Sequence, residues 1–159
     1  MTHLPRSASF RLDGKHALVT GGGRGIGLAA ASALAQAGAH VTLAARTKME
    51  IEAAASAIRA RGGKAEAMVL DVTDVEAARN AVATAEPFQI LINNAGINRP
   101  AYLADVNVED FDAIFAVNVR AAFFMAQAVA LRLVASKLPG SIINISSQMG
   151  HVGAARRTV

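Results

Sequence analysis

The first stretch whose residues could do chemistry is a cluster of glycines between a short apolar run and a helical pattern. It reads TGGGRGIG, residues 20–27, and it follows HALVT, residues 16–20. Glycines let the backbone turn sharply and let a diphosphate approach the amide N–H groups at the positive end of a helix. The spacing of Gly21, Gly25 and Gly27 differs from the usual G-x-G-x-x-G but meets its looser form. Between a strand and a helix, this cluster predicts a dinucleotide site rather than an ordinary tight turn.

The residue after the second apolar run bears on which dinucleotide binds. HVTLAA, residues 40–45, is followed by Arg46. A carboxylate in this place would bind the free 2′-hydroxyl of a ribose, whereas a guanidinium can form a charge-assisted pair with a 2′-phosphate. Arg24, inside the glycine cluster, could flank the same phosphate. We therefore expect NADP(H) to be preferred over NAD(H); the alternative is that Arg46 is solvated and the site accepts either cofactor.

Polar residues also follow the third and fourth apolar runs. Asp71 comes after AEAMVL, where its carboxylate could accept a hydrogen bond from an adenine amine or could only close a turn by bonding its own backbone. Residues 93–96 read NNAG and follow FQILIN. Their two amides can tie neighbouring strands together, and the glycine allows close backbone approach. By themselves these four residues also fit an ordinary asparagine-rich turn.

Two more polar features lie in the second half of the chain. Asn118 stands in the apolar stretch FAVNVRAAF, and a pair of serines that ends with Ser147 closes the last apolar run. Because a buried amide costs free energy unless it is paired, we expect Asn118 to be buried and to bond a backbone carbonyl, a water or an active-site partner, or to be purely structural. A hydrolase using Ser147 would need a positioned histidine, and His151 in the adjoining loop does not supply one.

The elements that must position these residues alternate along the chain. Apolar runs predict strands at residues 16–20, 40–45, 65–70, 88–93 and 141–146. Helical patterns lie at 27–37, at 48–61, in a short helix to about 84 that Thr73 and Glu76 would start as a capping box, and at 109–137. The pattern predicts an α/β fold with a doubly wound parallel sheet and helices on both faces. Ligands in such sheets bind outside the carboxyl ends of the strands.

The longest helical pattern carries an apolar stripe, which is typical of the buried face of a helix. Its members are Phe111, Phe115, Ala122, Val129 and Leu133.

Composition narrows the function classes. The 159 residues are 53% hydrophobic and 18% charged and include no cysteine, which predicts one domain without disulfides and fits a cytoplasmic protein. No apolar run approaches the roughly 18 residues of a membrane span, and no apolar segment of a secretory signal precedes Lys15. The net charge of +4 comes from scattered basic residues with 4% aromatics, so we expect no nucleic-acid partner. The four histidines lack ligand spacing, so no metal site is expected.

Taken together, the glycine cluster, NNAG, Asn118 and ISS at residues 145–147 resemble in order and spacing the short-chain dehydrogenase/reductase family, over essentially the whole chain from Leu12. The resemblance implies a Rossmann-type fold and hydride transfer between NADP(H) and a ketone or secondary alcohol. It implies a small-molecule carbonyl or alcohol as substrate, and a homotetramer or homodimer packed through residues 109–137. The family's hydride chemistry needs no metal.

The resemblance also implies roles for particular residues. Glycines of the cluster with Ile26 would hold the diphosphate, the two arginines would favour NADP(H), and the remaining residues would border the adenine and the ribose. The implied cofactor-binding residues are Gly21, Arg24, Gly25, Ile26, Gly27, Arg46, Asp71, Val72, Asn93, Ala95 and Gly96. For catalysis, Asn118 would position a proton-relay water and Ser147 would polarise the substrate oxygen.

The family also uses a tyrosine that exchanges the proton and, four residues later, a lysine that lowers the pKa of that tyrosine. The family spacing puts this tyrosine just after Val159, and Tyr102 has Val106 rather than a lysine four positions on. We expect residues 1–159 to be one dinucleotide-binding domain of a longer protein, without its C-terminal strands and helices. The alternative is a nucleotide-binding fragment or pseudo-enzyme without turnover. A Tyr-x-x-x-Lys after Val159 would distinguish the two.

Overall fold

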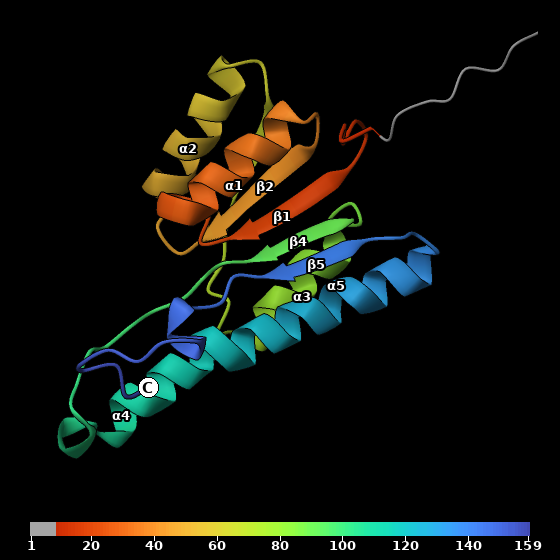
Figure 1. Cartoon of the computed structure of the whole chain (residues 1–159). Helices are drawn as coiled ribbons and strands as arrows, with labels where there is room; N and C mark the ends of the chain where they lie inside the picture. Colours follow the sequence, from red (N-terminus) through yellow and green to blue (C-terminus); the bar gives the residue numbers. More distant parts are fainter. Residues whose placement is uncertain (1–8) are drawn as a thin grey trace, which may run out of the picture.

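The core of the protein is a five-stranded parallel sheet (Figure 1). The computed structural model describes residues 9–159; residues 1–8, on which part of the argument against a secretory signal rests, lie outside the described residues. The strands are β1 (His16–Thr20), β2 (His40–Ala45), β3 (Lys64–Val69), β4 (Ile90–Asn93) and β5 (Ser141–Asn144). They lie in the order β3-β2-β1-β4-β5, and every pair is parallel.

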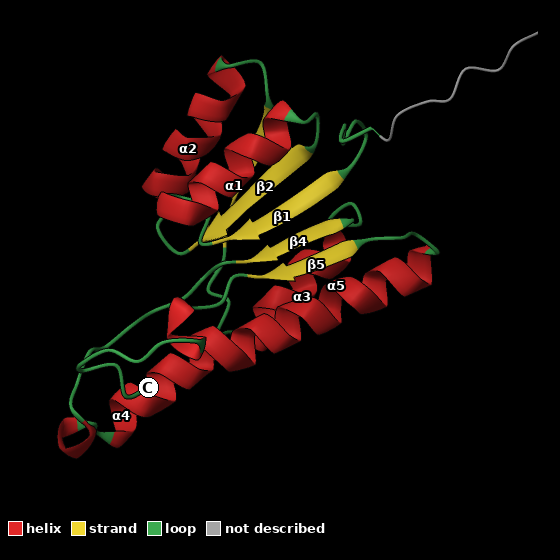
Figure 2. Cartoon of the chain, viewed as in Figure 1, coloured by secondary structure: helices red, strands yellow, loops and turns green. Residues whose placement is uncertain are grey.

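Helices cover both faces of this sheet (Figure 2). Helices α1 (Gly25–Gln36) and α2 (Lys48–Ala60) pack on one face, and α3 (Val75–Thr84) packs with the long helix that precedes β5 on the other. The direction of winding reverses between β1 and β4, which is the position at which doubly wound sheets bind ligands. The predicted Rossmann-type fold is therefore confirmed.

The period-2 alternation of the strands divides the core into two layers. Ala17 and Val19 of β1 face α1 and α2, whereas Leu18 points to the opposite layer with α3 and the long helix. All three side chains are fully buried. Because a central parallel strand buries both of its faces, it reads as a continuous apolar run, and this explains why the strands could be recognised in the sequence.

Several helices and strands begin or end a few residues away from their predicted bounds. Helix α1 begins at Gly25, two residues before its predicted start, because the turn is completed by Arg24 in extended conformation. The capping box predicted from Thr73 is wrong. Asp74 is the N-cap of α3 and accepts a hydrogen bond from the amide of Ala77, since the Thr73 hydroxyl is already bonded to Asp71.

The long helix is interrupted by a π-helical segment. It consists of α4 (Val108–Phe115), the π segment η2 (Ala116–Ala121) and α5 (Ala122–Ser136). The predicted stripe holds for Val129 and Leu133, which are buried, whereas Ala122 is half-buried and Phe111 and Phe115 are 42% and 43% exposed. A π turn inserts extra residues into the helical repeat, so a face extrapolated at a regular spacing rotates away from the core on passing through it.

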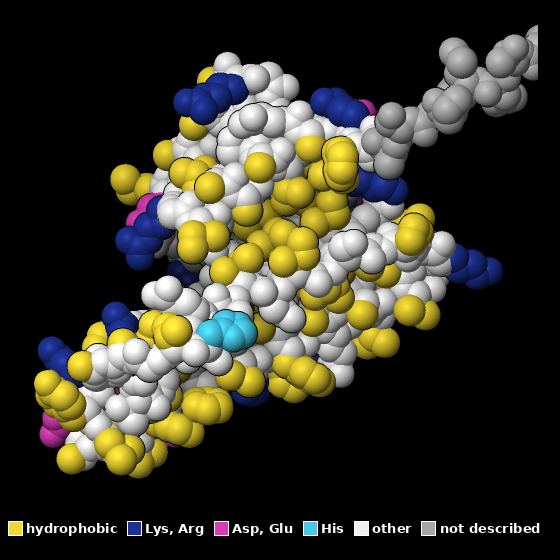
Figure 3. Space-filling view, viewed as in Figure 1, with side chains coloured by type: hydrophobic (Ala, Val, Ile, Leu, Met, Phe, Trp, Pro, Cys, Tyr) yellow, Lys and Arg dark blue, Asp and Glu magenta, His cyan; other side chains and the backbone are white. Residues whose placement is uncertain are grey.

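By length and composition, the helix Val108–Ser136 could cross a membrane, with a mean hydropathy of 1.7 over its most apolar window. From the sequence we expected no apolar run to approach the roughly 18 residues of a membrane span, and by this measure one window of the helix does. Only 22% of that window is buried, and hydrophobic side chains are visible along the helix in the space-filling view (Figure 3). In this fold the buried side of α5, with Met125 and Val129, packs beneath the sheet.

Candidate functional site

Thr20, the last residue of β1, ties the glycine turn to the end of β4. Its buried hydroxyl oxygen accepts hydrogen bonds from the amides of Asn94 and Ala95, each 3.0 Å long, and it donates to the carbonyl of Ile92 at 3.3 Å. The Asn94 side-chain amide donates in return to the carbonyls of Thr20, at 3.0 Å, and Gly21, at 3.2 Å. Five hydrogen bonds thus fix the backbone at the point where the sheet reverses its winding.

The glycine turn brings the start of α1 against this junction. Gly21 and Gly25 have φ angles of +63° and +56°, a conformation that residues with a Cβ rarely adopt. A Cβ on Gly27 would lie 2.3 Å from the carbonyl oxygen of Gly21, so only glycine allows this approach. No side chain caps α1, and its first N–H groups are therefore free for an anion at the positive end of the helix dipole. These features fit a diphosphate.

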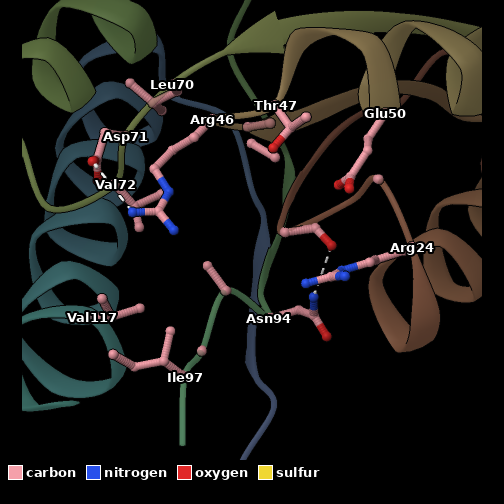
Figure 4. Close-up of a pocket in the computed structure, with 16 residues that line it drawn as sticks. Arg24, Arg46, Thr47, Glu50, Leu70, Asp71, Val72, Asn94, Ile97 and Val117 are labelled. Atoms are coloured by element: carbon pink, nitrogen blue, oxygen red, sulfur yellow. Dashed lines mark hydrogen bonds and ion pairs between the residues drawn. The ribbon is translucent and has the colours of Figure 1, made fainter. Parts of the chain in front are cut away.

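A cavity of about 270 Å³ opens beside the turn, at the carboxyl ends of the strands (Figure 4). The residues predicted to bind cofactor that line it are Gly21, Arg24, Arg46, Asp71, Val72, Ala95 and Gly96. Gly25, Ile26, Gly27, Asn93, Asn118 and Ser147 lie outside its lining. Thr47, Glu50 and Val117 also line it and were not predicted from the sequence, as does Asn94, which was recognised in NNAG but not assigned to the cofactor. Thr47 and Glu50 have the spacing of a capping box, which could have drawn attention to them.

Asp71 closes a turn and also faces the cavity. Its carboxylate accepts hydrogen bonds from the hydroxyl of Thr73 at 2.7 Å and from the amide of Thr73 at 2.9 Å, as expected for a turn aspartate. These bonds, more than the nearby Arg46 guanidinium, hold the pKa of Asp71 below its ordinary value. Arg46 reaches across the cavity to within 4.0 Å of the same carboxylate (Figure 4). The carboxylate is therefore ionised at neutral pH.

The first asparagine of NNAG, Asn93, uses its side chain to link parts of the fold. Asn93 is buried, and its side-chain nitrogen donates to the carbonyl of Ala122 at 3.0 Å and to the side-chain oxygen of Asn144 at 2.9 Å. It therefore connects β4 to β5 and to the start of α5, as expected of an amide that ties neighbouring strands. Its side chain is used in these bonds, whereas the backbone of Ala95 and Gly96 borders the cavity.

Asn118 lies in the π segment and clamps the loop that follows β4. Its side-chain oxygen accepts from the amide of Ile97 and its side-chain nitrogen donates to the carbonyl of Ile97, both at 2.9 Å. The expected partner, a backbone carbonyl, is present, but the expected burial is wrong, because Asn118 is exposed. The two hydrogen bonds to Ile97 hold this side chain in place although it is not buried.

Ser147 follows β5 and begins the short 3₁₀ helix η3 (Gln148–Gly150). Its hydroxyl oxygen accepts from the amide of Met149 at 3.1 Å. Because the oxygen acts as acceptor in that bond, its proton remains to be donated to another group.

Tyr102 lies just before the 3₁₀ helix η1 (Leu103–Asp105). It is 59% exposed, and the Arg156 guanidinium is 5.8 Å from its ring centre. Within residues 9–159, no group of three histidine, aspartate or glutamate side chains could hold a metal ion.

Comparison with known proteins agrees with this geometry. The family model described as short chain dehydrogenase matches residues 15–159. The chain belongs to the short-chain dehydrogenase family. Among its relatives, the gluconate 5-dehydrogenase of Gluconobacter oxydans is 45% identical over 142 residues, which cover 87% of this chain and 55% of that protein. The D-erythrulose reductase of Gallus gallus is 44% identical over 140 residues, covering 88% and 54%.

Solved structures of short-chain dehydrogenases superpose closely on this fold. A gluconate 5-dehydrogenase from Burkholderia cenocepacia, solved with NADP and tartrate, matches with a TM-score of 0.87 and 38% identity. The match covers 94% of this chain and 60% of that one. The chain thus spans 54% to 60% of the length of these three proteins.

Proposed function

We propose that the protein is an oxidoreductase that transfers a hydride between NADP(H) and a ketone or secondary alcohol. The observation that carries this proposal is the cavity at the winding reversal, which adjoins an uncapped helix N-terminus and is lined by Arg24 and Arg46. A diphosphate and a 2′-phosphate are the anions that such groups would bind. Family membership supports the same chemistry.

The nicotinamide, when bound, supplies or accepts the hydride, and this chain's residues would position and polarise the reactants. The N–H groups of Gly25, Ile26 and Gly27 would bind the diphosphate, and Asp71 with Val72 would border the adenine. The Ser147 hydroxyl would donate a hydrogen bond to the substrate oxygen, where negative charge develops during reduction. Asn118 would fix the loop at Ile97 and orient a water for the proton relay.

The names of the relatives suggest the substrate class. They include a gluconate 5-dehydrogenase, a D-erythrulose reductase and a sorbitol dehydrogenase, all of which are named for polyhydroxylated compounds. We propose that the substrate is a polyol or the corresponding ketose. We also propose that the protein acts in the cytoplasm. The second candidate is nucleotide binding without turnover, because the only tyrosine among residues 1–159, Tyr102, has Val106 rather than a lysine four positions on.

The NADP(H) assignment is tested on protein purified from the organism that produces it, so that any residues after Val159 are present. An intact mass above 16.4 kDa identifies such residues. We expect NADPH to be oxidised in the presence of a ketose and Arg46→Asp to raise the KM for NADPH about 100-fold, because charge-assisted pairing is replaced by repulsion. The KM for NADH should change little.

Arg61→Asp is the matched control, since Arg61 follows α2 at its other end and does not line the cavity. It should leave both KM values unchanged. NADPH binding without oxidation of the cofactor by any ketose would favour the second candidate. Equal effects of the two arginine substitutions would contradict the NADP(H) assignment.

We also propose that the protein is a homodimer or homotetramer packed through the long helix. The supporting observation is its exposed apolar face, with Val119, Phe123, Leu131 and Val134 at 54% to 75% exposure (Figure 3). Val134→Glu should dissociate the oligomer in analytical ultracentrifugation, because an unpaired charge would enter an apolar contact. Met49→Glu, at an equally exposed residue of α2, should not. A monomeric wild-type protein would contradict this proposal.

A further inference from the structure

The charges around the cavity do not favour an anion as strongly as the two arginines suggest. Four charged side chains line it, and they are Arg24, Arg46, Glu50 and Asp71. Their formal charges cancel. A receptor for a doubly charged 2′-phosphate would be expected to carry an excess of positive charge. One of the two carboxylates must therefore weaken the phosphate site or be neutralised by another group.

The negative charge of Asp71 is largely compensated by its neighbours. It accepts two hydrogen bonds from Thr73 and lies 4.0 Å from Arg46. Glu50 differs, because its carboxylate has no hydrogen-bond or ion-pair partner within residues 9–159. The close-up shows it pointing from the first turn of α2 toward the glycine turn that carries Arg24 (Figure 4). A Cβ on Gly23 would lie 3.4 Å from one of its oxygens, so the carboxylate reaches that turn.

The local sequence makes this orientation unusual. Thr47 is the N-cap of α2 and Glu50 stands three residues later, which is the spacing of a capping box. In that motif the threonine hydroxyl would bond the amide of Glu50 and the glutamate would bond the amide of Thr47. The Thr47 side chain caps nothing here, and both side chains line the cavity instead. The two groups that would close the helix end are thus left free to face a ligand.

We propose that Glu50 is a specificity-determining residue of the cofactor site, which opposes the 2′-phosphate of NADP(H) and lets the site accept NAD(H) as well. A carboxylate repels a phosphate dianion but can accept a hydrogen bond from a 2′-hydroxyl. Arg24 and Arg46 attract the phosphate, and Glu50 limits the margin by which NADP(H) is preferred. This inference rests on the proposed function of the same cavity.

The test compares Glu50→Gln with wild type in the full protein, using fluorescence titrations with NADPH and NADH. Glutamine keeps the size of the side chain and removes its charge. We expect NADPH to bind about fivefold more tightly, since the carboxylate and the phosphate face each other in a solvated site, and NADH to bind within twofold of wild type. Adenosine 2′,5′-bisphosphate and 5′-AMP isolate the phosphate's contribution and should show the same contrast.

Glu52→Gln is the matched control. Glu52 lies on the same helix but pairs with Lys48 at 3.6 Å and does not line the cavity, so its substitution should change neither affinity. Unchanged or weaker NADPH binding in Glu50→Gln would overturn the inference and leave the proposed function intact. A wild-type protein that binds neither dinucleotide would overturn both.

Discussion

Replacing Thr20 by valine is expected to destabilise the protein by about 2 kcal/mol, because two half-buried amides would lose their acceptor and each such loss costs about 1 kcal/mol or more. Valine has nearly the shape of threonine, so the packing of β1 is preserved. The amides of Asn94 and Ala95 both donate to the lost hydroxyl oxygen. Chemical denaturation measures the change, and dinucleotide binding should weaken in parallel because the same junction fixes the glycine turn.

The chain offers a close control for this substitution. Thr42 of β2 is equally buried, but its hydroxyl donates only to the carboxylate of Glu66, which water can reach. Thr42→Val should therefore cost less than about 1 kcal/mol. Thr20→Ser, which keeps the hydroxyl and removes one methyl group, should also cost about 1 kcal/mol. If Thr20→Val were no more destabilising than Thr42→Val, the hydroxyl would not be what joins the two strands.

Thr20 also shows why part of the site could not be predicted from the sequence. It was read as the end of a strand, and that position was correct. Its partners, Asn94 and Ala95, are more than seventy positions away along the chain. Periodicity identifies elements but does not give the register of one strand against another, and the register decides which polar groups meet.

The features that could be predicted depend on local chemistry. Apolar runs gave the five strands, and the turn formed by Asp71 followed from an aspartate that can bond its own backbone. The π segment could not be predicted, because the apolar pattern of residues 116–121 is compatible with an ordinary α-helix. Its effect was to expose Phe111 and Phe115, which regular spacing placed on the buried face. The free side chains of Thr47 and Glu50 were equally hidden, since their spacing is that of a capped helix.

The glycine turn provides the second large expected effect. Gly27→Ala would place a Cβ 2.3 Å from the carbonyl oxygen of Gly21 and 2.5 Å from the side-chain nitrogen of Asn94. Both groups are held by the junction at Thr20, so neither can move without breaking hydrogen bonds. We expect a loss of about 3 kcal/mol in the free energy of unfolding, as for severe overpacking, together with loss of measurable dinucleotide binding.

Gly25→Ala separates this collision from backbone strain. A Cβ on Gly25 would meet nothing within 4 Å, but the residue has a φ of +56°. The cost should be limited to the strain of the left-handed conformation, about 1–2 kcal/mol. Dinucleotide affinity should fall less than in Gly27→Ala, because the N–H groups at the start of α1 keep their positions. If both alanine substitutions had the same effect, strain rather than the close approach of Gly21 and Gly27 would explain the need for glycine. If Gly27→Ala retained wild-type stability and affinity, the turn would have to be looser than its contacts indicate, and the diphosphate would need another site.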